Sequence, residues 1–427
     1  MILTLLAALQ VAAAPVLVAD TLPALTLAEA LQRGTGLDPN YVDALGRVGE
    51  AEWGRRNAIL AFIVPAVDLS MSWDQYSKPV FNFATGQLQQ NSAQGTLNFR
   101  YEVLSVRKFT ELGRSRADQE ATEANEVKQR YRAALLIEST FYEVLAESRL
   151  LQVADDRARR AEEQLAVARA RVLSGATVQT DSLQLLLEFT KARVEQLRTR
   201  TLLDVARLEL GRRTGSDGPV DAVPLETGVP QQLPLTLDQA VAEALATGPD
   251  WMIARASAHA AERHLQGLRG DYLPRLDLAY SRLQFDDHFY PSAYGLSDLT
   301  IRITWTLWDL GRRELAIAQA TTQRNVADAV SADLMRAARH DVARAYEAFE
   351  TARAALDLQL TSVVVAQETF RVQQERYKSG AATILDLLDA QVNLTQAQAD
   401  LVQAAFVARL AWAGLEAILG KRLTPSN

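Results

Sequence analysis

The sequence predicts a mainly α fold with transmembrane β-structure, in which two pairs of long antiparallel helices are combined with two β-hairpins. Two observations support this prediction. The chain of 427 residues repeats its own order of motifs, and each copy holds two alternating apolar and polar stretches followed by a long helical hairpin. Because the sequence contains no cysteine, neither a disulfide framework nor a thiolate metal site is expected.

The composition limits the classes of function. Apolar residues make up 48% of the chain, which is enough for a large buried core. The 45 basic and 52 acidic residues are mixed along the sequence and leave a formal charge of -7, so no basic patch is available for a phosphate backbone. Nucleic acid is therefore not an expected partner.

Residues 1–19 predict a secretory signal peptide, because an apolar run is followed by small residues at Ala12, Ala14 and Ala19. A buried first helix is the alternative. Beyond this segment the sequence contains no uninterrupted run of 18 apolar residues, and a transmembrane helix is not expected. Passage through a membrane is therefore expected to be made by strands.

The internal repeat divides the chain into a first copy at residues 20–219 and a second copy at residues 220–427. The motif Leu25–Ala30 returns as Leu235–Ala240, and each motif predicts a helix start with a capping box. The capping pairs are Thr26 with Glu29 and Thr236 with Gln239. Further motifs in the same order in both copies are Pro65 with Pro274 and Gly113 with Gly311.

Each copy ends in a long pair of helices. The two pairs are expected at about residues 113–213 and about residues 311–419. Gly113 lies 62 residues before the turn glycine Gly175, whereas Gly311 lies 69 residues before Gly380. This difference is one heptad, which lengthens a coiled coil without rotating its buried face. The first long helix extends about 90 Å at about 1.5 Å per residue, so a coiled coil or a tunnel wall is predicted.

The hairpins are expected at about residues 66–104 and about residues 275–309, with strands of about ten residues that alternate in polarity. The apolar positions are Val67, Leu69, Met71 and Trp73, then Leu97, Phe99, Tyr101 and Val103, then Leu276, Leu278 and Tyr280, then Leu299, Ile301, Ile303, Trp305 and Leu307. This pattern suits lipid on one face and water on the other, although a soluble sandwich would show the same alternation.

Four strands cannot close a barrel by themselves, and open sheet edges are not tolerated in lipid. Three copies that donate four strands each would form a trimeric 12-stranded β-barrel, with the helices arranged as a tunnel beneath it. A homotrimer is therefore expected.

These motifs resemble the TolC-like outer-membrane efflux proteins over about residues 25–420. The resemblance rests on the repeated Leu-Thr-Leu motif, the prolines before the strands, the Gly-Arg pairs and the two Ser-Gly-Ala turns. It implies an exit duct of a tripartite efflux or type I secretion system in the outer membrane, with a large periplasmic part. The implied partners are outer-membrane lipid, a periplasmic adaptor (membrane fusion) protein and an inner-membrane pump. A periplasmic coiled-coil scaffold or adaptor without a channel is the alternative.

The resemblance also implies a gate at the helical tips. Tyr377 corresponds to a tyrosine that ties the closed entrance, with Thr180 and Asp181 as its hydrogen-bond partners. Asp386 and Asp389 correspond to aspartates that line the constriction. The family has an arginine where this chain has Ala382, so a looser latch is expected, or one held by Arg371 or Lys378. The tip turns that an adaptor would grip are Ser174, Gly175 and Ala176 and then Ser379, Gly380 and Ala381.

Physical chemistry adds to the gate hypothesis. Asp386 and Asp389 lie on one helical face, so a trimer would bring six carboxylates around one axis. Crowded carboxylates raise the pKa of some members and attract cations. The alternative is that both aspartates simply favour the positive end of the helix dipole. Gly175 and Gly380 are expected to supply the positive φ that a helix reversal needs.

An enzyme is not predicted, because no histidine pairs with a glutamate in a metal-binding motif and neither a phosphate-binding loop nor a serine elbow occurs. The histidines are His259, His264, His288 and His340. No cofactor and no metal site are expected.

Overall fold

The computed structural model describes residues 22–82, 86–175, 178–225, 228–230, 232–289 and 294–423. The predicted signal peptide and Ala176 of the first tip lie outside the described residues. The described parts of the chain form two compact units, one within residues 22–30 and 140–225 and one within residues 31–139 and 228–423.

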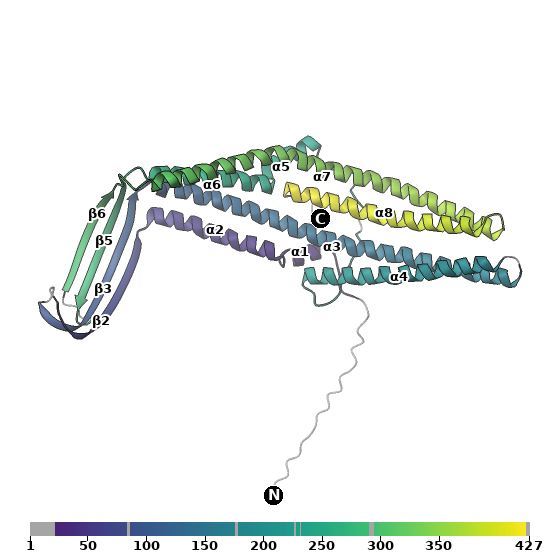
Figure 1. Ribbon diagram of the computed structural model, residues 1–427, viewed down its shortest axis with the longest axis horizontal. Coiled ribbons are helices and arrows are strands. Elements are labelled where there is room, and N and C mark those ends of the chain that lie inside the picture. Colours follow the sequence, from purple (N-terminus) through teal and green to yellow (C-terminus); the bar gives the residue numbers. More distant parts are fainter. Residues whose placement is uncertain are drawn as a thin grey trace, which may run out of the picture. The chain divides into compact units, whose positions relative to one another are not determined.

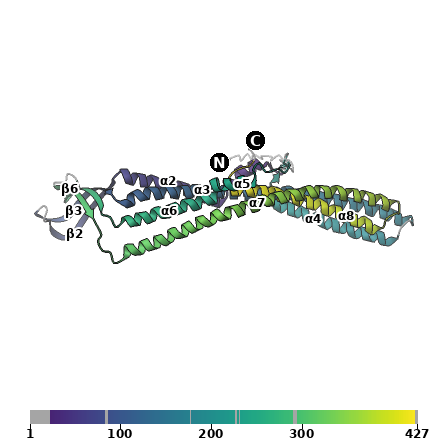
Figure 2. The ribbon, with the colours of Figure 1, turned by 90° about the horizontal axis from the view of Figure 1, so that it is seen from above.

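The elements follow one another in the order in which the two copies predict them (Figures 1 and 2). They are β1 (Ala24–Leu25), α1 (Leu27–Thr35), α2 (Pro39–Ile63), β2 (Ala66–Asn82), β3 (Gln87–Leu104), α3 (Val106–Leu173), α4 (Gln179–Thr214), β4 (Asp221–Ala222), α5 (Leu237–Thr247), α6 (Pro249–Gly270), β5 (Arg275–Asp286), β6 (Tyr294–Thr304), α7 (Arg312–Lys378) and α8 (Ile384–Leu419). Both predicted capping pairs form: the Thr26 hydroxyl accepts from Glu29 N, and Thr236 and Gln239 make a complete capping box.

The smaller unit contains the second part of α3 packed against α4. Its seam is built from small residues, since Ala158, Ala161 and Ala192 are all buried and lie together. Beside this seam Arg157 and Glu188 form an ion pair at 2.5 Å with side chains only 19% and 10% exposed. Small side chains permit the close approach of the helices, and the ion pair fixes their register.

The larger unit contains one four-stranded antiparallel sheet in the order β2-β3-β5-β6 (Figure 1). The strands lie where alternation predicts them, but β2 and β3 have 17 and 18 residues and are much longer than the ten expected. Alternation weakens beyond Trp73, where β2 carries polar residues on both sides, so the periodic signal ended before the strand did.

The pairing of β3 with β5 joins the hairpins of the two copies into one sheet. The compact units therefore do not coincide with the sequence repeats, and the boundary between them falls inside α3. The division at residues 219 and 220 describes the repeat of the sequence only, and it remains a prediction.

α7 leads from the end of β6 to the second tip. α7 has 67 residues and so extends about 100 Å at about 1.5 Å per residue. α3 begins at Val106 and not near Gly113 as predicted. The earlier start has a local cause, because β3 ends at Leu104 and the Ser105 hydroxyl accepts a hydrogen bond from Lys108 N at 3.4 Å.

α8 packs its predicted seam against neighbouring helices. Leu387, Leu394 and Leu415 are at most 3% exposed. Near its end, Leu415 and Leu419 form a core with Val342 of α7 and with Ala240 and Ala244 of α5.

Within the described residues, α8 is the one helix whose length and average composition resemble those of a membrane span, although it holds no uninterrupted run of 18 apolar residues. By length and composition this helix could cross a membrane, with a mean hydropathy of 1.4 over its most apolar window. Charged residues such as Arg409 and Glu416 interrupt its apolar runs, but they are few enough for the average to remain high. Its seam residues are buried in protein, as expected for a helix that belongs to a core.

Candidate functional site

The turn between α7 and α8 forms the second tip. Gly380 has φ 79°, which is the positive value predicted from the sequence. The turn is closed by a 2.7 Å hydrogen bond from Ala381 N to Arg376 O, and the Ser379 hydroxyl donates to the same carbonyl at 3.0 Å. The glycine therefore permits a reversal within a few residues.

The start of α8 carries a capping box that the sequence analysis missed. The Asp386 carboxylate accepts from Thr383 N at 2.9 Å and from the Thr383 hydroxyl at 2.8 Å, and that hydroxyl accepts from Asp386 N. These hydrogen bonds, with the nearby charge of Arg376, lower the pKa of Asp386. A threonine three residues before an aspartate was the available signal.

Asp386 and Asp389 are both exposed on the first turns of α8. Within the described residues the carboxylate of Asp389 has no hydrogen bond or ion pair, whereas that of Asp386 caps the helix. Because the helix dipole acts on a nearby charge without a hydrogen bond, the dipole and the gate both remain possible roles of Asp389.

Tyr377 lies in the last turn of α7 and is 7% exposed. Thr180 is exposed and Asp181 is half-buried in the first turn of α4. Tyr377 belongs to the larger unit, whereas Thr180 and Asp181 belong to the smaller one. The link among these three residues remains a prediction.

The cations predicted to replace the missing arginine are already paired within α7. Arg371 binds Glu368 at 2.6 Å, and Lys378 binds Glu375 at 2.9 Å. The side chain that reaches the turn is Arg376, which donates to the carbonyl of Ala381 at 3.3 Å. Arg376 was not singled out from the sequence because it precedes the motif that carries the family resemblance.

The first tip differs from the second. Gly175 again has a positive φ of 74°, and the Ser174 hydroxyl donates to Arg171 O at 3.0 Å. At the start of α4, however, the N-cap residue is Val178, which makes no side-chain capping bond. Of the two return helices, only α8 therefore has a capped beginning.

The four-stranded sheet has two chemically distinct faces. One face carries the apolar positions predicted from the sequence, and its side chains are largely uncovered: Leu69 is 69%, Ile301 69% and Ile303 72% exposed. The register places Val67, Phe99, Tyr280 and Leu299 in one row on this face. Such a continuous exposed apolar face marks a contact with lipid or with another protein surface.

The opposite face is polar and charged. Its rows include Asp68, Asn98, Ser281 and Asp298 and then Glu102, Asp277 and Arg302. Arg100 forms an ion pair with Asp68, and Arg275 lies 3.4 Å from Asp277. This face suits water.

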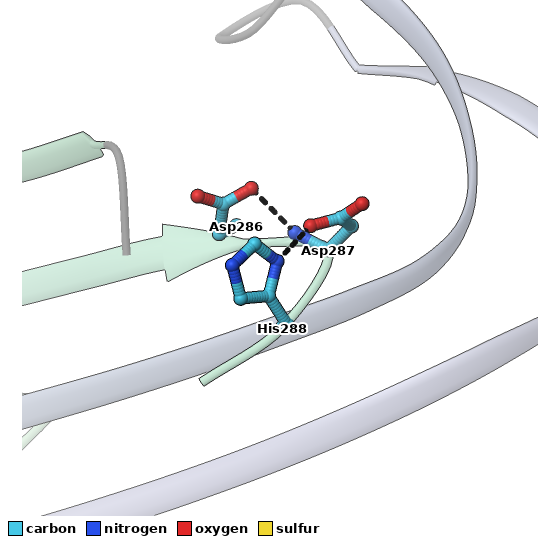
Figure 3. Close-up of side chains that lie close together, drawn as sticks. All are labelled: Asp286, Asp287 and His288. Atoms are coloured by element: carbon cyan, nitrogen blue, oxygen red, sulfur yellow. Dashed lines mark hydrogen bonds and ion pairs between the residues drawn. The ribbon is translucent and has the colours of Figure 1, made fainter. Parts of the chain in front are cut away.

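A group of possible metal ligands occurs at the end of β5, where Asp286, Asp287 and His288 lie close together (Figure 3). Asp287 N donates to the Asp286 carboxylate at 2.8 Å, and the His288 ring lies against the Asp287 carboxylate. These contacts are an acidic turn and a neighbouring histidine, and they need no ion.

Residues 240–421 match the family model described as outer membrane efflux protein. The resemblance to the TolC-like outer-membrane efflux proteins is thereby confirmed, and the predicted outer-membrane location with a periplasmic part agrees with it.

Curated relatives carry the same kind of name. The alkaline protease secretion protein AprF of Pseudomonas aeruginosa is 26% identical over 253 residues, which cover 58% of this chain and 52% of that protein. The pyoverdine export outer membrane protein OpmQ of Pseudomonas putida is 28% identical over 284 residues, 61% of this chain and 56% of that protein. The matched part thus spans about half the length of these relatives.

Solved structures share the fold. A membrane protein from Pseudomonas aeruginosa aligns with a TM-score of 0.79 at 18% identity, covering 94% of this chain and 91% of that one. The outer membrane protein VceC from Vibrio cholerae aligns with a TM-score of 0.77 at 18% identity, covering 93% and 97%. The predicted fold class, long helices with strands that belong to a barrel, is confirmed by these comparisons.

Proposed function

We propose that this chain is one protomer of a homotrimeric outer-membrane duct, the exit of a tripartite efflux or type I secretion system. The observation that carries the proposal is the two-faced sheet with two open edges. Its apolar face is exposed along the strands, while its polar face carries charges. A duct needs both faces, because one side meets lipid and the other side meets the cargo in water.

The edges of the sheet imply the oligomer. Within the described chain, β2 and β6 each pair on one side only. Each unpaired backbone group in lipid costs several kcal/mol, so these edges require partners. Pairing of β6 with β2 of the next copy repeats around an axis and closes, and three copies give 12 strands. The long helices that continue from each strand then surround a tunnel.

The tips supply the gate in this proposal. Tyr377 with Thr180 and Asp181 ties the closed entrance, and the exposed Asp386 and Asp389 of three copies form an acidic ring. The turns at Gly175 and Gly380 are the surface for a periplasmic adaptor, and an inner-membrane pump supplies the energy. Opening is a shift between two arrangements of the tips, of which the adaptor binds the open one more tightly. The duct performs no chemistry and needs no cofactor or metal.

Membrane fractionation tests this function against a coiled-coil scaffold. The expected result is that the protein stays in the outer-membrane pellet after extraction with sodium carbonate and after high salt. In SDS without heating it should migrate as an oligomer that boiling converts to monomer. A scaffold would wash off, and protein recovered in the soluble fraction as a folded monomer would refute the duct.

A further inference from the structure

A cavity of about 890 Å³ lies where the end of α2 meets the polar face of the sheet. All of its lining residues belong to the larger unit, and α2 leads directly into β2 at this place (Figure 1). The charged lining residues are Arg100, Arg275, Arg302, Glu102 and Asp277.

The register of the strands explains why this cavity forms. Ala66, Arg100, Ala279 and Thr300 occupy one row across the sheet. Three of these four side chains are small, so the row forms a floor with space above it and one guanidinium at its edge. The next row contains Glu102, Asp277 and Arg302, which rim the same space.

The charge of the lining favours an anion. Three guanidinium groups outnumber the two carboxylates. Asp277 is engaged by Arg275 at 3.4 Å, and Arg100 is paired with Asp68, which lies outside the lining. Arg302 has no hydrogen bond or ion pair within the described part of the chain, so its planar pair of donors is available for a carboxylate, sulfonate or phosphate.

The rest of the lining is mostly apolar, with Asn57 and Tyr101 as its other polar side chains besides Thr300. Leu60 and Val64 of the last turn of α2 and its C-cap line the cavity and are 53% and 49% exposed. Ala61 and Pro65 complete this wall. Apolar side chains left open beside the guanidinium of Arg302, which has no ion pair in the described part of the chain, fit a ligand that has one apolar part and one anionic group.

We infer that this cavity binds amphipathic organic anions, with Arg302 and Arg100 holding the anionic group and the end of α2 covering the apolar part. Binding itself does not depend on the proposed duct. Only the role of these anions as cargo rests on it, because the polar face would then line the passage. The acidic tip lies at the other end of α7, about 100 Å away at about 1.5 Å per residue, so the two charged regions act independently.

A matched pair of fluorescent probes tests the site in the full-length protein held in nanodiscs of zwitterionic lipid. One probe, 8-anilinonaphthalene-1-sulfonate, carries an anionic group, whereas N-phenyl-1-naphthylamine has the same rings without it. Arg302→Gln and Arg100→Gln should each weaken binding of the sulfonate about threefold to tenfold, as expected for partly exposed charged contacts. Binding of the neutral probe should not change.

Two further variants serve as controls. Arg282 lies on the opposite face of the same sheet, in the row of Leu69 and Leu97, so Arg282→Gln should leave sulfonate binding unchanged. Arg302→Lys keeps the charge but loses the planar pair of donors, and its affinity should fall between those of the wild type and Arg302→Gln.

Several outcomes would overturn the inference. Sulfonate binding that is insensitive to Arg302→Gln and Arg100→Gln together would do so, as would an equal loss for the neutral probe. The same variants also separate this inference from the proposed function. The wild-type protein could resist carbonate extraction and conduct in planar bilayers, yet bind the sulfonate no better than Arg302→Gln does. This outcome would support the duct and refute the anion site.

Discussion

The end of α8 is held by a buried cluster of charges whose disruption should be measurable. The guanidinium of Arg422 binds Glu138 of α3 and lies 2.6 Å from Glu416 of α8. Both carboxylate side chains are only 3% exposed. Glu416 also accepts hydrogen bonds from Trp412 Nε1 at 3.0 Å and from Leu423 N at 2.8 Å. Burial opposes the charge on Arg422, but the two carboxylates outweigh this effect and raise its pKa.

Replacement of Arg422 by methionine should destabilise this region strongly. Arg422→Met keeps the aliphatic stem but leaves two buried carboxylates without their shared cation. Removal of one partner from a buried ion pair costs about 3–5 kcal/mol, because the remaining charge is buried and unpaired. The control is Arg371→Met, since Arg371 pairs with Glu368 on the surface with side chains 64% and 60% exposed. Such exposed pairs contribute about 0–1 kcal/mol.

Amide hydrogen exchange of the full protein in lipid or detergent is the suitable assay, because it reports local opening free energies. At about 1.4 kcal/mol per factor of ten, exchange in the last turns of α8 should accelerate about 150-fold or more in Arg422→Met. Arg371→Met should change exchange in α7 by no more than about fivefold. An acceleration of less than tenfold in Arg422→Met, with unchanged protection of Trp412, would show that the cluster contributes little and would refute this reasoning.

Three other predictions concern the pH dependence of stability, the start of α8 and the acidic pair at the tip. Burial raises the pKa of Glu138, so ionisation of this carboxyl costs more free energy in the folded than in the unfolded protein. The free energy of unfolding should therefore receive its full contribution from protonated Glu138 below the ordinary pKa of 4.5 and lose that contribution as the pH rises. Denaturation of Glu138→Gln, measured between pH 4.5 and 8, should lack this loss. Thr383→Ala should cost about 1 kcal/mol and speed exchange in the first turn of α8, whereas Val178→Ala, at a start without a side-chain cap, should not affect exchange in α4. Asp386→Ala with Asp389→Ala should abolish block of single-channel current by multivalent cations, and unchanged block would contradict the acidic ring.

Much of the architecture was determined by the sequence itself. Period-two alternation located both hairpins, and the spacing of Gly175 and Gly380 located the turns at which the helices reverse. These features are local: a strand with one apolar face and a turn with positive φ are recognised from neighbouring residues alone. The resemblance to the outer-membrane efflux proteins followed from the same local motifs and was confirmed.

Other properties depended on contacts between residues that are distant in the sequence. The pairing of β3 with β5, the buried cluster of Glu138, Glu416 and Arg422, and the cavity beside Arg302 all join segments separated by more than a hundred residues. A linear pattern does not show which strand lies beside which, or whether Arg376 or Arg371 reaches the turn. Only the tertiary structure decides such questions, because burial and pairing of charges are set by neighbours in space.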